Sequence, residues 1–290
     1  MRKTDKNGGI FMSVDLLQEK IRKTKNPSVL VLEAFGENLP ETMEDFRSYY
    51  GALLEQLKGL VPAVRFGFGS FALGCGLETL SALTRQAKEL GYYVILDGPE
   101  ILSAQSAENM ARALGDPESP WVWDGLVISP WLGSDVMKPF LDLCGSGKAV
   151  FCAIRTGNKS AAQLQDLLSG GRLAHTAAAD IVIRHAEGVM GKCGYANLAA
   201  TAPAGSADPL RTLRTKYNRL FLLVDGYDYS FGNSKNCAQA FDKLGHGAAV
   251  CAGSSIAAAW KENEERTPLE AALEAAQKMK KNLARYVTVL

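Results

Sequence analysis

The sequence predicts an α/β protein built as a single (β/α)8 TIM barrel. Eight short apolar segments recur along the 290 residues, and each is followed by a segment with the apolar spacing of a helix. The length and the 47% hydrophobic content suit one barrel, and no polar linker divides the series. Eight uninterrupted units favour a closed barrel over a doubly wound sheet. We expect the barrel at residues 13–290, after a flexible polar extension at residues 1–12.

The strands are predicted from apolar runs that end at a charged or small polar residue, as buried parallel strands do. The third run is the clearest, because Gly98 and Pro99 stop it directly after Asp97. The second run is expected to end just before Arg65. The eight expected strands are 28–32, 60–64, 92–97, 123–128, 149–154, 198–202, 221–224 and 248–252.

The helices are predicted where apolar residues recur three or four positions apart. Pro27 ends the first helix, Gly91 follows the C-terminal end of the third, and Pro268 opens the last. The expected helices are 14–25, 44–57, 76–90, 103–114, 136–143, 171–189, 208–217 and 268–286.

Polar residues gather where the expected strands end. Barrel enzymes keep their functional groups at the C-terminal ends of the strands, so these residues are the candidates for a functional site. They are Glu33, Arg65, Asp97, Ser129, Thr156, Asp225 and Ser254.

Composition narrows the function classes. Lys and Arg number 32 against 31 Asp and Glu, so no overall field favours nucleic acid or an anionic membrane. No apolar stretch approaches the roughly 20 residues that span a bilayer. The six cysteines form no C-x-x-C pair, which argues against a zinc site or a redox motif. We expect no signal peptide, so these cysteines should be reduced thiols in the cytoplasm. The chain carries no Walker or dinucleotide-binding motif, so we expect no cofactor and no metal.

Several segments resemble the longer bacterial form of orotidine 5'-phosphate decarboxylase, in family order from about Ser13 to Trp260. The resemblance implies a homodimeric TIM barrel, a pyrimidine nucleotide ligand, and active sites shared at the subunit interface. The matching segments are KIRKTKNPSVLVLE, VPAVRF, GLVISPWLGSDVMKPFL, AIRTGNKSAAQLQDL, GKCGYANLAATAP and LLVDGY.

The resemblance fails at the catalytic positions. The family reaction loses carbon dioxide from the pyrimidine and leaves a carbanion, so it needs a cation that donates a proton, held by carboxylates. Glu33 corresponds to the family Asp of the first strand, and Arg65 to the Lys of the second. In the family's D-x-K-x-x-D motif only Asp97 is kept, while Pro99 and Leu102 occupy the Lys and final Asp positions.

The phosphate-binding positions differ as well. Ser230 stands at the position of the family Gln, and Ser254 at that of the family Arg, so a phosphate loses its charged partner. The loop retains Gly226, but Asp225 and Asp228 add negative charge. Two other residues, Ser106 and Thr156, match family positions that contact the nucleotide.

These departures leave three interpretations open. In the first, the protein is a catalytically impaired or non-catalytic homologue that binds a partner, a modified ligand or its own active homologue. In the second, it keeps residual carboxy-lyase activity with Lys159 as a substitute proton donor, although the sequence favours an ordinary exposed loop lysine at that position.

The third interpretation is a different acid-base or lyase reaction on an unphosphorylated or cationic ligand. Glu33, Asp97 and Glu100 could then converge on a divalent cation or form an acid-base set, with Arg65 gripping a substrate carboxylate. The simpler alternative is that Glu33 and Asp97 form salt bridges with Arg65 across the barrel mouth, and the sequence favours that alternative.

Overall fold

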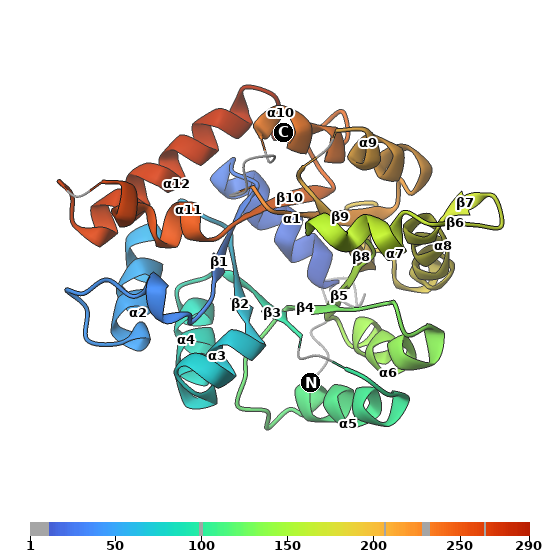
Figure 1. The fold of residues 1–290 in the computed structure, drawn as a ribbon, viewed down its shortest axis with the longest axis horizontal. Helices are drawn as coiled ribbons and strands as arrows, with labels where there is room; N and C mark the ends of the chain where they lie inside the picture. Colours follow the sequence, from blue (N-terminus) through green and yellow to red (C-terminus); the bar gives the residue numbers. More distant parts are fainter. Residues whose placement is uncertain (1–11, 99–100, 206, 228–232, 264) are drawn as a thin grey trace.

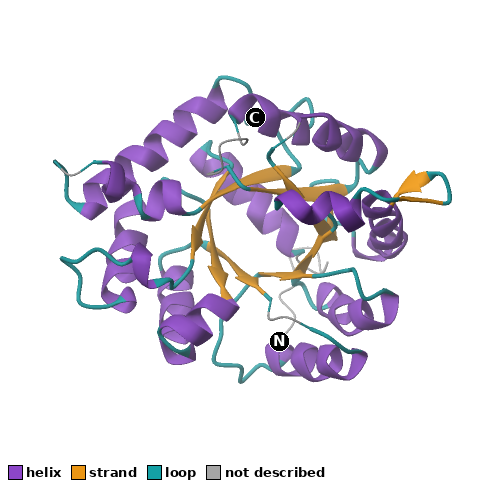
Figure 2. Ribbon diagram, viewed as in Figure 1, coloured by secondary structure: helices purple, strands orange, loops and turns teal. Residues whose placement is uncertain are grey.

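The computed structural model describes residues 12–290, except 99–100, 206, 228–232 and 264. It confirms the predicted fold: eight parallel strands close into a barrel in the order β1-β10-β9-β8-β5-β4-β3-β2, and helices surround it (Figures 1 and 2). All but one residue of the expected N-terminal extension lies outside the described residues. The barrel strands are β1 (Ser28–Leu32), β2 (Ala63–Gly67), β3 (Tyr93–Asp97), β4 (Gly125–Ile128), β5 (Ala149–Ala153), β8 (Ala196–Pro203), β9 (Leu220–Asp225) and β10 (Ala248–Ala252).

Helices cover the outside of the barrel, and the longer ones pack an apolar face against the core. In the part of the chain that the structure describes, no helix is long and apolar enough to cross a membrane. The helices are α1 (Ser13–Thr24), α2 (Phe46–Leu57), α3 (Phe68–Gly74), α4 (Leu77–Glu89), α5 (Ala104–Gly115), α6 (Ser134–Gly145), α7 (Ala162–Gln165), α8 (Ala174–Ala186), α9 (Ala207–Lys216), α10 (Ser234–Cys237), α11 (Ser254–Ala257) and α12 (Pro268–Ala284).

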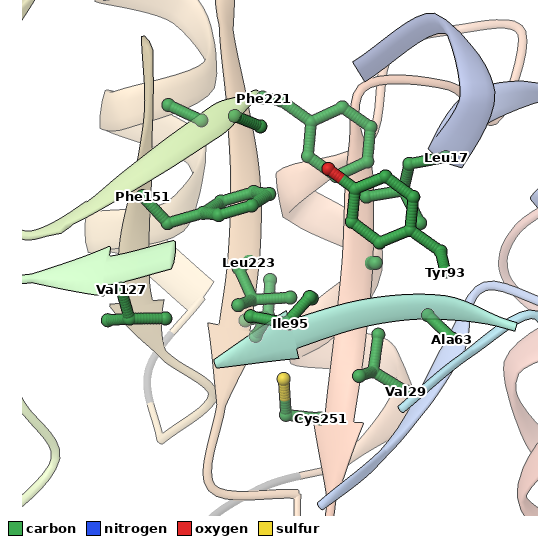
Figure 3. Close-up of a cluster of buried hydrophobic side chains, with 14 of the residues drawn as sticks. Leu17, Val29, Ala63, Tyr93, Ile95, Val127, Phe151, Phe221, Leu223 and Cys251 are labelled. Atoms are coloured by element: carbon green, nitrogen blue, oxygen red, sulfur yellow. The ribbon is translucent and has the colours of Figure 1, made fainter. Parts of the chain in front are cut away.

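The barrel interior is a packed core. Large side chains fill it, and Figure 3 shows the rings of Tyr93, Phe151 and Phe221 close together among aliphatic residues. The Phe151 and Phe221 rings meet edge to face with centroids 6.4 Å apart, a favourable aromatic geometry. Because this core fills the lower part of the barrel, open space remains at the C-terminal mouth.

Helix α1 covers the N-terminal end of the barrel. Val14, Leu17 and Ile21 recur at helical spacing and are fully buried. The Ser13 hydroxyl lies 2.8 Å from the Tyr93 hydroxyl, and the Val14 amide donates to the Asn197 side chain at 3.0 Å. The helix therefore both seals the core and satisfies polar groups at the base of the barrel.

Two elements differ from the sequence prediction in ways that affect the mouth. Strand β2 runs to Gly67, so Arg65 lies inside the strand and pairs in register with Val31 and Ile95. A charged residue is tolerated there because its guanidinium is ion-paired at the mouth.

The helix expected at 171–189 begins only at Ala174. Gly170 and Gly171 both have positive φ and form the turn between two short antiparallel strands, β6 (Leu168–Ser169) and β7 (Arg172–Leu173). This conformation is easy for glycine and costly for other residues, so the glycine pair makes a hairpin where helical periodicity suggested a longer helix.

Leu17→Ala should lower the free energy of unfolding by about 3 kcal/mol, because it opens a void in the fully buried contact between α1 and the barrel. The measurement is urea denaturation followed by circular dichroism. The matched control is Leu244→Ala at a leucine that is 51% exposed, where we expect a change below about 0.5 kcal/mol. Equal effects of the two substitutions would contradict the role given to α1.

Candidate ligand-binding site

A cavity of about 620 Å³ opens at the C-terminal mouth of the barrel, a volume that suits a small organic molecule. Every barrel strand contributes one residue to its wall, so the site depends on closure of the whole sheet. These residues, from β1 to β10 in chain order, are Val31, Arg65, Asp97, Val127, Ala153, Thr201, Asp225 and Cys251.

The floor of the cavity is an ion-paired arginine. Arg65 is 8% exposed, and its two terminal nitrogens reach different strands. Nη2 donates to Asp97 Oδ2 at 2.6 Å, and Nη1 donates to Asp225 Oδ1 at 2.5 Å. The buried Nε–H has no hydrogen-bond partner among the described residues. The guanidinium thus bridges β3 and β9 from β2, with both terminal nitrogens engaged.

The ion pairs and the burial of the floor alter the ionisation of Arg65 and of Asp225. Burial alone would lower the pKa of Arg65, but Asp225 and Asp97 together raise it well above its ordinary value. Burial raises the pKa of Asp225, Arg65 opposes that rise, and Asp97 adds to it. The Asp225 side chain is 32% exposed. Its pKa is nevertheless raised, because Arg65 is shared with Asp97 and compensates the charge of Asp225 only in part. The floor therefore holds a permanently protonated arginine and a carboxylate short of positive charge.

Cys251 lies beside this pair on β10. Its sulfur is 3.9 Å from Arg65 Nη1, and burial together with the charge of Asp225 raises the pKa of the thiol well above its ordinary value. A thiol held protonated in this way is a weak nucleophile. Cys251 therefore contributes shape and a weak donor to the floor.

The loop between β5 and α7 forms one side of the mouth and is fastened at its base. Arg155 makes two hydrogen bonds to the Asp166 carboxylate, at 3.0 and 2.7 Å, and the buried His175 lies 3.0 Å from the same carboxylate. Gln165 accepts from the Thr156 amide at 2.8 Å. These bonds join the two ends of the loop, so residues 156–159 are held at the cavity edge.

The structure places the sequence candidates in different parts of the mouth. Those that line the cavity are Glu33, Arg65, Asp97, Thr156, Lys159, Asp225 and Gly226. Ser254 instead lines a neighbouring cavity of about 690 Å³ beside α12, whereas Ser106 and Ser129 are exposed and line neither cavity. Ser106 bonds to Ser103, and the Ser129 hydroxyl accepts from the Trp131 amide.

Other sequence candidates lie at the rim or outside the described residues. Leu102, at the position of the final family Asp, is 83% exposed. Pro99, Glu100, Asp228 and Ser230 lie outside the described residues. The cation site suggested from Glu33, Asp97 and Glu100 thus has one member that the structure does not describe. Within the described ranges, no group of three or more His, Cys, Asp or Glu could hold a metal ion.

The ion pair expected between Asp97 and Arg65 is present. Asp225 is a second partner that the sequence placed at a strand end without joining it to Arg65. Thr201 and Cys251 were missed because they lie within apolar runs. A signal for them existed in the strand alternation, since the inward-facing residue nearest each strand's end belongs to the mouth of a barrel.

Comparison with known protein sequences finds relatives that are named orotidine 5'-phosphate decarboxylase. Orotidine 5'-phosphate decarboxylase of Rhodopirellula baltica is 28% identical over 268 residues, covering 86% of this chain and 89% of that protein. The enzyme of Caldicellulosiruptor saccharolyticus is 25% identical and covers 85% and 90%. No family model matches the chain.

Solved structures with the same fold carry related names. A putative orotidine 5'-phosphate decarboxylase from Streptomyces avermitilis superposes with a TM-score of 0.79 at 16% identity, covering 98% of this chain and 99% of that one. A putative orotidine-monophosphate decarboxylase from Toxoplasma gondii gives 0.77 at 16% identity, covering 95% and 98%. At this identity the structural likeness establishes the barrel fold.

Replacing Arg65 should destabilise the folded protein, because the two carboxylates on the cavity floor would lose their shared cation. Arg65→Met leaves Asp97 and Asp225 without their shared cation, so we expect a loss of about 3 kcal/mol in the free energy of unfolding at pH 7.5. The unpaired carboxyls then have pKa values above those in the unfolded chain. Their protonation as pH falls therefore favours the folded state, and the loss should shrink at pH 5.

The matched control for this experiment is Arg172→Met, which removes an ion pair with Asp180 that has an exposed arginine. We expect it to cost less than about 1 kcal/mol, with little change between the two pH values. Urea denaturation at both pH values measures all three proteins. A pH-independent loss in Arg65→Met would contradict the assignment of the floor charges.

Proposed function

Since this chain is a divergent relative of the orotidine 5'-phosphate decarboxylases, we propose that it is a catalytically impaired homologue that retains the barrel mouth as a small-ligand site. The family reaction requires a cation that stabilises the carbanion at the pyrimidine ring and then gives it a proton. Two features of the site support the proposal: the lack of a proton-donating cation and the change in the residues expected to bind the phosphate.

The observation that carries the proposal is the state of Arg65. Asp97 and Asp225 occupy its two terminal nitrogens, and the pKa of the guanidinium is raised well above its already high value. An arginine in this state neither releases a proton at neutral pH nor turns toward a substrate without breaking a buried ion pair. Pro99, at the family's proton-donor position, has no ionisable group.

The phosphate end supports the same conclusion. Asp225 directly precedes Gly226, the glycine that corresponds to the family's phosphate-binding loop, and its carboxyl lines the cavity. Ser254, at the position of the family arginine, faces the neighbouring cavity beside Tyr227. A phosphate dianion would therefore approach a carboxylate without gaining a guanidinium.

A second candidate function, residual decarboxylation, is favoured by one observation. Lys159 lines the cavity from the fastened loop, so an ammonium group lies at the edge of the site. The side chain is exposed. Even so, this arrangement gives Lys159 a route to a bound ring if the loop closes further.

Purified protein should show no decarboxylation of orotidine 5'-monophosphate above the uncatalysed rate. The assay follows loss of orotate absorbance, with the Rhodopirellula baltica relative as the positive control. Turnover by the wild-type protein would contradict the proposal. If that turnover disappeared in Lys159→Ala and persisted in the surface control Lys216→Ala, Lys159 would be the substitute proton donor.

We place a second copy of the chain against the mouth face, as the family resemblance implies. Large apolar side chains are exposed in the segments that follow β1 to β5, which are five neighbouring strands of the eight in the barrel. Burying such side chains in an interface is favourable, and their clustering on one side of a monomer marks an interaction surface. They are Phe35, Leu73, Leu102, Trp131, Leu132, Leu164, Leu167 and Leu168.

Sedimentation velocity should give a species of twice the mass of the chain. Leu73→Asp combined with Leu102→Asp should weaken the dimer by at least tenfold, or about 1.4 kcal/mol, because two charges would be buried at the rim. The control is Leu244→Asp, an exposed leucine in the loop that enters β10 at the opposite end of the barrel. A wild-type monomer at micromolar concentration would refute the dimer.

The proposed location is the cytoplasm. The structure assigns all six cysteines as free thiols, and four of them are buried. Free thiols persist in a reducing compartment, which supports this location.

A further inference from the structure

We propose that the mouth cavity binds a small organic cation, such as a primary amine on a short chain, with its charged end on Asp97 and Asp225. This inference rests on the proposed function, because it requires that the site no longer serves a nucleotide phosphate. It names the ligand class that the altered floor would take.

The charges on the floor do not balance. Asp97 and Asp225 both pair with Arg65, so two carboxylates share one guanidinium. Their side chains remain 34% and 32% exposed, and the cavity is the space they face. The paired oxygens are Oδ2 of Asp97 and Oδ1 of Asp225, so each carboxylate has a second oxygen with acceptor capacity. A ligand ammonium could donate charge-assisted hydrogen bonds to both of these oxygens.

The polar groups of the floor are also incompletely satisfied by the protein itself. Arg65 has a side chain nine-tenths buried, yet its Nε–H finds no acceptor among the described residues. Unpaired buried donors are uncommon in folded proteins. Because an N–H donor takes an acceptor and an ammonium offers none, the preference for a cation rests on the cavity and on the two carboxylates that share one guanidinium.

An anion would be disfavoured at the same place. Both terminal nitrogens of Arg65 are occupied, so a carboxylate or phosphate would have to displace Asp97 or Asp225 from a short ion pair. The displaced carboxylate would then lack a cation in a partly buried position, which is costly. The floor therefore discriminates between ligands by the sign of their charge.

The walls indicate that the cation is organic. Val31, Val127 and Ala153 line the cavity above the floor and offer an apolar surface to a hydrocarbon stem. At the edge formed by the fastened loop, Thr156, Asn158 and Lys159 supply hydroxyl, amide and ammonium groups. A ligand with an amine at one end and an oxygen at the other would match both ends of the site.

The test uses three probes of equal chain length that differ in charge: 5-amino-1-pentanol, 1,5-pentanediol and 5-hydroxypentanoate. Saturation-transfer NMR and calorimetric titration on the full chain measure their binding. We expect the amine to bind at least tenfold more tightly than the diol, and the hydroxy acid more weakly than either. Equal binding of the three probes, or preferred binding of the acid, would overturn the inference.

Variants locate the bound amine. Asp97→Asn and Asp225→Asn should each weaken amine binding at least fivefold, whereas Asp180→Asn, a carboxylate on α8 outside the cavity, should leave it unchanged. Circular dichroism checks that each variant folds. Unchanged amine binding in both floor variants would overturn the inference, because the probe would then be bound elsewhere.

A pH series on the wild-type protein gives a test that needs no variant. Asp225 faces Arg65 from β2, Asp97 from β3 and Cys251 from β10, and its pKa is raised. Protonation as pH falls removes the charge that holds the amine, so affinity should decrease as the pH is lowered, at a higher pH than an ordinary aspartate would give. A pH-independent affinity would contradict the assignment of the amine to Asp225.

The outcomes also separate this inference from the proposed function. If orotidine 5'-monophosphate were decarboxylated, the proposed function would fail whatever the probes did. If neither decarboxylation nor amine binding occurred, the impaired-homologue proposal would stand and the cationic-ligand inference alone would fail.

Discussion

The bridge from Arg65 to Asp97 and Asp225 is the interaction on which the mouth of this barrel depends. It ties β2 to β3 and to β9, which is not adjacent to β2 in the sheet. It also fixes the charge of the floor, because it uses both terminal nitrogens of the one buried cation among the described cavity residues. A lysine at the same point would hold one carboxylate at a time and keep a transferable proton. The planar, strongly basic guanidinium holds both carboxylates in fixed positions but does not release a proton at neutral pH.

The rest of the barrel supports that pattern. The aromatic and aliphatic core below the mouth excludes water, which strengthens the ion pairs above it. Helix α1 closes the opposite end, and the Arg155, Asp166 and His175 contacts hold the β5–α7 loop at the cavity edge. The barrel that carries the cavity has the same fold as the solved structures it superposes on.

The fold could be predicted from the sequence because each strand is a short apolar run, whereas in each helix apolar residues recur three or four positions apart. The strand at 248–252 was placed without error, since Gly253 and a glycine at 247 bound it clearly. The hairpin at residues 168–173 was missed because its strands are two residues long and the flanking periodicity is helical. Apolar periodicity does not reveal a turn such as the one in which Gly170 and Gly171 reverse the chain direction.

The site was predictable only in part for a geometric reason. Glu33, Arg65 and Asp97 were identified because polar residues at strand ends share the mouth of a barrel. The pairing of Arg65 with Asp225 joins residues 160 positions apart and depends on which way a long side chain turns, which no sequence period encodes. The same limit applies to Ser254, whose position after β10 suggested the main cavity but whose side chain faces the neighbouring one.

The central claim is that the Arg65 floor and its two carboxylates have replaced a nucleotide site. Calorimetric titration with uridine 5'-monophosphate tests it most directly, because product binding reports on the base and phosphate subsites without requiring turnover. The account predicts no measurable binding at ligand concentrations of several hundred micromolar. Stoichiometric binding in the low micromolar range would contradict it and would mean that the mouth still holds a nucleotide despite its altered charges.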